Sequence, residues 1–145
     1  AFVAIPLLVT FIPMLTDTGG NAGSQSSTLV IRGMALSEIR VGDFLKVFFK
    51  EFRVSLIVGL GLSIANFIRI MISYKDPMIA LTVSLSLYLT VVIAKAVGGI
   101  LPIFAKLVKA DPAIMAAPII TTVVDACALL IYFWLATQLL PGFIG

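Results

Sequence analysis

Apolar runs long enough to cross a lipid bilayer recur along this chain of 145 residues. A spanning helix needs about 20 mostly apolar residues, and four segments approach or exceed that length: residues 2–31, 54–72, 78–101 and 113–140. Hydrophobic residues make up 61% of the chain and charged residues 12%, roughly half the charged share of a soluble domain. The pattern predicts one all-α membrane domain, a polytopic helical bundle over residues 1–145.

The predicted segments begin and end at recognisable signals. Pro77 follows Asp76, and Pro112 follows Asp111. Proline is favoured in the first turn of a helix and aspartate at its N-cap, so both pairs predict helix starts. Pro141 follows the last apolar run and predicts its end.

Basic residues are concentrated in two of the links between these segments. Residues 32–53 contain five of them, and the link before Asp111 contains Lys106 and Lys109, whereas the C-terminal tail contains none. By the positive-inside rule, these two links face the cytoplasm and the C-terminus lies outside the cell membrane. Apolar and charged residues alternate irregularly over residues 37–53, which predicts an amphipathic helix on the cytoplasmic surface.

The orientation also bears on where the chain begins. The first predicted segment starts outside, without an initiator methionine or a cleavable signal peptide. We therefore expect a fragment that lacks an earlier spanning helix, with or without a cytoplasmic domain before it.

A single carboxylate, Asp125, lies near the middle of the last apolar run. A charge at that depth costs about 2.5–3.5 kcal/mol even on lenient insertion scales, and it commonly marks an ion pathway. Helical spacing places a small and polar stripe around it (Ala117, Pro118, Thr121, Thr122, Ala128 and Tyr132), and apolar residues such as Ile120 and Val124 on a lipid or packing face. In the structural alternative, Asp125 bonds to Lys95 or Asn66 of a neighbouring helix. Lys95 itself is expected to reach the cytoplasmic interface, and a role in the pore is the alternative.

The first apolar segment contains a second polar constellation. Residues 16–28 contain three glycines and many hydroxyl and amide side chains. Glycine allows a ligand to approach the backbone closely, and side-chain oxygens suit hard cations. Close helix packing through small residues is an alternative reading of the same pattern.

Two motifs resemble the MgtE family of magnesium channels and transporters. The first is Pro13-Met14-Leu15-Thr16-Asp17-Thr18-Gly19-Gly20-Asn21-Ala22-Gly23-Ser24-Gln25-Ser26 followed by Val30-Ile31-Arg32-Gly33, which is similar to that family's second transmembrane helix. The second is Asp111-Pro112-Ala113, Ala117-Pro118 and Thr121-Thr122-Val123-Val124-Asp125, which resembles its fifth helix. The resemblance covers the whole chain and implies that its spans are helices two to five, without the first helix and without the cytoplasmic N and CBS domains.

The resemblance implies a function and a set of site residues. Family members are homodimers with one pore on the two-fold axis, through which hydrated Mg²⁺ passes. The metal-site residues implied for this chain are Asp125, Gly20, Asn21, Gly23, Thr121 and, at the cytoplasmic mouth, Asp111. Asp17 departs from the family pattern and is expected toward the outside, where it either gathers cations at the pore mouth or caps the helix.

The chemistry of magnesium agrees with so few carboxylates. Mg²⁺ usually keeps several of its waters, so one or two carboxylates and some neutral oxygens suffice. The expected partners are therefore Mg²⁺, a second copy of the chain and the lipid bilayer, with no nucleic acid and no enzymatic activity. Two alternatives remain open: a proton-coupled transporter in which Asp125 is the relay, and a membrane scaffold that conducts nothing.

Overall fold

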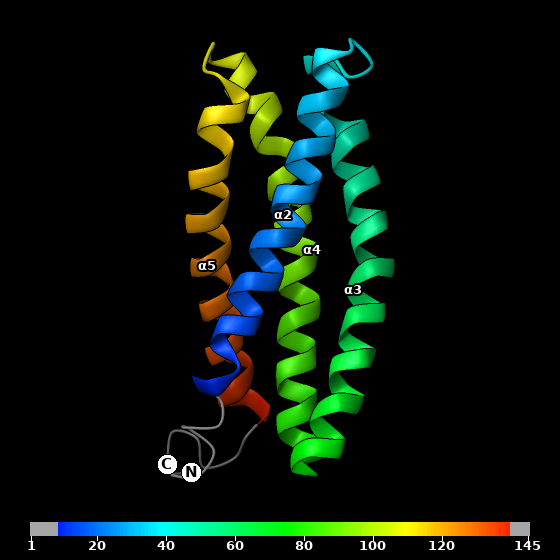
Figure 1. The fold of residues 1–145 in the computed structure, drawn as a ribbon, viewed down its shortest axis with the longest axis vertical. Helices are drawn as coiled ribbons and strands as arrows, with labels where there is room; N and C mark the ends of the chain where they lie inside the picture. The colour runs from blue at the N-terminus through cyan, green and yellow to red at the C-terminus, as the bar shows by residue number, and fades with distance from the viewer. Residues whose placement is uncertain (1–8, 140–145) are drawn as a thin grey trace.

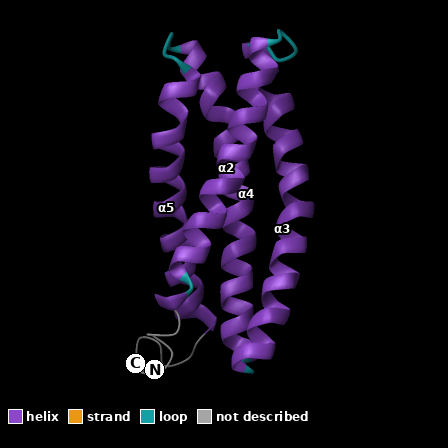
Figure 2. Ribbon diagram, viewed as in Figure 1, coloured by secondary structure: helices purple, strands orange, loops and turns teal. Residues whose placement is uncertain are grey.

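The computed structural model of the protein describes residues 9–139, apart from the side chains of residues 41, 44 and 112–117. Over this range the chain forms four α-helices, which are α2 (Ile12–Ala35), α3 (Phe44–Tyr74), α4 (Pro77–Leu107) and α5 (Pro112–Leu139). A short 3-10 turn, Val41–Asp43, precedes α3. The helices run alongside one another in one bundle, and the described residues contain no strand (Figures 1 and 2). The prediction of an all-α polytopic bundle is confirmed.

Helix α4 holds the bundle together because it packs against α2, α3 and α5. Val83, Val91 and Ala94 along it are all fully buried. Small residues bring α2 and α4 into backbone contact: a Cβ at Gly98 would overlap the carbonyl group of Gly23. Such close approach is typical of helix pairs in membranes, where packing replaces the hydrophobic effect as the driving force.

Both predicted proline helix starts are found. Helix α4 begins at Pro77 and α5 at Pro112. The Asp76 carboxylate accepts hydrogen bonds from the backbone N–H groups of Met78 (3.1 Å) and Ile79 (3.3 Å), which satisfies two otherwise unpaired donors of the first turn.

The segment predicted as a separate amphipathic helix over residues 37–53 is organised differently. Residues 44–53 are the first turns of α3, which continues unbroken to Tyr74. The chain has no glycine or proline between residues 44 and 58, so nothing in the sequence ends the helix there. Val47 and Glu51 are buried against Gly99 of α4. This part of α3 therefore belongs to the bundle, and its depth in a membrane stays a prediction.

Within the described range, three helical segments are long and apolar enough to cross a membrane: Leu45–Tyr74, Pro77–Leu107 and Pro118–Leu139. Helix α2 has 24 residues but does not qualify, because polar residues interrupt its apolar character. It nevertheless packs within the bundle against α4 and α5, and it crosses in front of α4 in the view of Figure 1.

The two basic links lie at the same end of the bundle, and the α3–α4 turn lies at the other end (Figure 1). This arrangement agrees with the prediction that both links share one side of the membrane. Which side that is remains a prediction.

Candidate functional site

Helix α2 has one polar face that its own bundle leaves uncovered. Asn21, Ser24, Gln25 and Thr28 are exposed and recur every three or four residues, so they form one stripe. They line a groove of about 550 Å³ together with Leu29 and Lys95. The other side of the helix is buried, including Gly19, Ala22 and Gly23. Polar side chains thus cover an open face of a helix whose remaining surface is packed.

The buried stripe of helix α5 contains other residues than the ones that helical spacing predicts. Ile120, Val124, Ala128 and Tyr132 are at most 1% exposed and form its packing stripe. The sequence placed Ala128 and Tyr132 with the polar residues, and this prediction is wrong. Helical spacing groups residues into stripes along a helix, but it does not say which stripe is buried. That depends on the neighbouring helices, which for α5 are α2 and α4. Asp125 is half-buried beside the packing stripe.

Two glycines of α2 fix its contact with α5. A Cβ at Gly19 would lie 2.7 Å from Val124 Cγ1, and a Cβ at Gly23 would lie 2.7 Å from Ile120 Cγ2. Asp125 follows Val124 and Thr121 follows Ile120 in the sequence. The predicted metal residues of α5, Asp125 and Thr121, therefore lie at the level of those of α2.

The three predicted metal residues on α2 have different environments. Gly23 is buried in the contact with α4 and α5, so its contribution is close packing. Gly20 is half-buried, and a Cβ placed there would meet open space. Asn21 is exposed and lines the groove. Gly20 and Asn21 thus leave the backbone and an amide accessible from outside the bundle.

Two further predicted residues lie away from this level. Asp111 is exposed in the link just before α5. Its 14-residue separation from Asp125 corresponds to roughly 20 Å of helix. Asp17 is exposed near the first turns of α2, toward the opposite end of the bundle. The structure does not bring either of them to Asp125.

The described part of one chain contains no closed metal cage of acidic or soft ligands. Among the described residues, no three histidine, cysteine, aspartate or glutamate side chains gather. The alternative role of Asp125, a structural hydrogen bond to Lys95 or Asn66, is also not supported, because both side chains bond to other residues. Lys95 donates to Ser26 Oγ at 3.5 Å, and the Asn66 side-chain oxygen accepts from Arg69 at 3.0 Å.

Glu51 is a charged residue of the interior that sequence reasoning missed. Its Oε2 accepts a hydrogen bond of 2.6 Å from Ser26, and it is only 5% exposed. Lys95, expected to reach the membrane interface, is also 5% exposed and bonds to the same serine. The position of Lys95 within an apolar span could have indicated that it is buried. Glu51 lies in a segment with several charged residues, so no sequence pattern indicated that it is buried.

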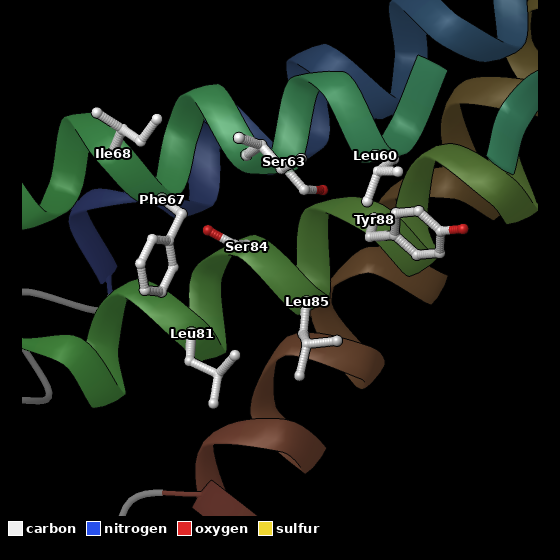
Figure 3. Close-up of a pocket in the computed structure, with 9 residues that line it drawn as sticks. Leu60, Ser63, Phe67, Ile68, Leu81, Ser84, Leu85 and Tyr88 are labelled. Atoms are coloured by element: carbon white, nitrogen blue, oxygen red, sulfur yellow. The ribbon is translucent and has the colours of Figure 1, made fainter. Parts of the chain in front are cut away.

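A second hollow of about 350 Å³ lies between α3 and α4 (Figure 3). Mostly apolar residues such as Leu60, Phe67 and Leu85 line it, together with Ser63, Ser84 and Tyr88. The Ser63 and Ser84 hydroxyls are buried without a hydrogen-bond partner among the described residues. No charged residue lines it, so it does not suit a cation.

The fold and the polar faces together define a polytopic all-α membrane domain in which three apolar helices accompany one helix with an open polar side. A family model described as a divalent cation transporter, MgtE, matches residues 12–135. The chain belongs to the MgtE family.

Curated relatives agree with this membership. The chain is 39% identical over 141 residues to the magnesium transporter MgtE of Thermus thermophilus, covering 96% of this chain and 31% of that protein. It is 37% identical over 137 residues to the magnesium transporter MgtE of Bacillus subtilis, covering 94% and 30%. A similar protein of the same name from Enterococcus faecalis is 25% identical over 138 residues. The chain thus spans about a third of the length of these relatives.

Proposed function

We propose that this chain is the membrane part of a magnesium transport protein, in which hydrated Mg²⁺ passes between two copies of the chain. The observation that carries the proposal is the open polar face of α2 at the level of Asp125. An uncovered stripe of amides and hydroxyls is costly against lipid, so it calls for a wet path or a partner. The magnesium transporter relatives support Mg²⁺ as the ion.

The chemistry of the ion fits a site shared by two copies. Mg²⁺ gives up its waters reluctantly and is commonly held by one or two carboxylates. Two copies of Asp125 supply two carboxylates, while Asn21, Thr121 and backbone oxygens near Gly20 are suited to bond the ion's waters. A path must also release its ion, so a site with few charges is suitable.

The ends of the path follow from the charge distribution. The links that carry most basic residues face the cytoplasm in this proposal, which places the C-terminus outside. Asp111 then lies at the cytoplasmic mouth and Asp17 at the outer mouth, where exposed carboxylates raise the local concentration of cations.

The test is Mg²⁺ flux through the full-length protein in liposomes. Asp125→Asn should lower flux at least about tenfold, because each lost carboxylate removes about 1.4 kcal/mol or more of attraction for a divalent ion. Asp125→Ala should do the same, and Asp125→Glu should retain partial flux. Glu38→Gln, which removes an exposed carboxylate from the first basic link, is the matched control and should conduct normally.

The same assay separates the alternatives. Normal flux through Asp125→Asn with an unchanged melting temperature would refute the pore-site role. A wild-type protein that moves no Mg²⁺ would instead support a scaffold. Flux that requires a pH gradient would support a proton relay at Asp125.

A further inference from the structure

Three helices each contribute one polar side chain to a buried network that does not include Asp125. Ser26 of α2 donates to Glu51 Oε2 of α3 at 2.6 Å, and Lys95 of α4 donates to Ser26 Oγ at 3.5 Å. The three residues are 0%, 5% and 5% exposed, respectively. One hydroxyl thus bridges a buried ammonium group and a buried carboxylate.

The surrounding backbone makes room for this network. A Cβ at Gly99 would lie 2.9 Å from Glu51 Cγ, so a larger residue on α4 would displace the glutamate. The contact between Gly23 and Gly98 lies three residues from both Ser26 and Lys95 and draws α2 against α4. Buried charges of opposite sign are tolerated when each has hydrogen-bond partners, as the serine provides here.

Lys95 also belongs to the proposed ion path. Its side chain forms part of the wall of the groove lined by Asn21, Ser24, Gln25 and Thr28. A positive charge in that wall lowers the affinity of the groove for a divalent cation. Glu51 accepts a hydrogen bond from the same Ser26 hydroxyl, and its negative charge offsets that of Lys95.

We propose that the Glu51–Ser26–Lys95 network sets the affinity of the polar groove for Mg²⁺. Lys95 weakens binding so that the ion is released, and the negative charge of Glu51, bonded to the same Ser26 hydroxyl, limits that repulsion. This inference rests on the proposed transport function. It assigns to Glu51 and Lys95 opposite effects on one measurable quantity, the Mg²⁺ concentration that gives half-maximal flux.

The experiment compares Lys95→Met, Glu51→Gln and the double variant of the full-length protein in liposomes. Lys95→Met should lower the half-saturating Mg²⁺ concentration about fourfold, the effect of one unit charge on a divalent ion about 10 Å away through water. Glu51→Gln should raise it by a similar factor, and the double variant should lie near the wild type. Lys46→Met and Glu38→Gln, at exposed positions, are the matched controls and should shift nothing.

A merely structural network would give a different pattern. Both single variants would then lower the melting temperature and the maximal flux. The half-saturating Mg²⁺ concentration would stay constant or shift in the same direction in both variants, and this result would overturn the inference. Lys95→Gln, which keeps a hydrogen-bond donor, replaces Lys95→Met if the latter does not fold, with the same sign expected. Asp125→Asn in parallel separates the two proposals: if it abolishes flux while the network variants shift nothing, only the network inference fails.

Discussion

At the scale of single residues, glycines decide where the helices meet. Gly19 and Gly23 receive side chains of α5, and Gly98 receives the backbone of α2. Gly61, in contrast, has open space where a Cβ would lie. Glycine in a helix costs about 0.5–1 kcal/mol relative to alanine, so each buried glycine is retained for the contact it permits.

Gly98→Ala should therefore destabilise the protein by about 1–3 kcal/mol, because the added methyl group forces α2 and α4 apart. Thermal unfolding in detergent measures the effect. Gly61→Ala is the matched control and should leave stability unchanged or raise it by about 0.5–1 kcal/mol. Equal stability of the two variants would contradict the close contact between Gly23 and Gly98.

At the scale of helices, end signals in the sequence correctly predicted where α4 and α5 begin. Local chemistry sets these ends, as the Asp76 cap and Pro77 illustrate. The start of α3 at Phe44 was not predicted, because its first turns carry charges typical of a surface helix. Only the contact with α4 shows that Val47 and Glu51 are buried.

The N-cap of α4 gives a prediction at this scale. Asp76→Ala should destabilise the protein by about 1 kcal/mol, because two backbone N–H groups lose their acceptor. Asp76→Asn should be nearly neutral, since asparagine caps a helix as well as aspartate does. Melting temperatures of the two variants decide the matter, and an equal loss in both would indicate that the charge rather than the cap is responsible.

At the scale of the whole molecule, the sequence predicted the helical bundle but not the Glu51–Ser26–Lys95 network. Membrane spans follow from length and composition, and Asp125 stands out because a carboxylate is rare in an apolar run. The pairing of Ser26 with Glu51 joins residues 25 positions apart on different helices, and no local pattern encodes such a contact. The same limitation put Tyr132 on the wrong stripe of α5.

The proposed dimer is testable by cross-linking. In a Cys127→Ser background, Ser24→Cys should form disulfide-linked dimers in membranes, because the polar face of α2 faces its copy across the two-fold axis in the proposal. Ile57→Cys, on a residue of α3 that is 76% exposed, is the control and should stay monomeric. Cross-linking through Ile57 but not through Ser24 would place the interface on another face.

The polar character of α2 also affects how the protein enters a membrane during synthesis. A helix that carries Asp17, Asn21 and Gln25 is a poor substrate for lateral release into lipid by itself, because each polar group would lose its water. Its buried side packs against α4, which is synthesised later and is long and apolar enough to cross a membrane. We therefore expect the contact with α4 to help hold α2 in the membrane. Substitutions that weaken this pairing should reduce the amount of protein reaching the membrane before they alter what the assembled protein does.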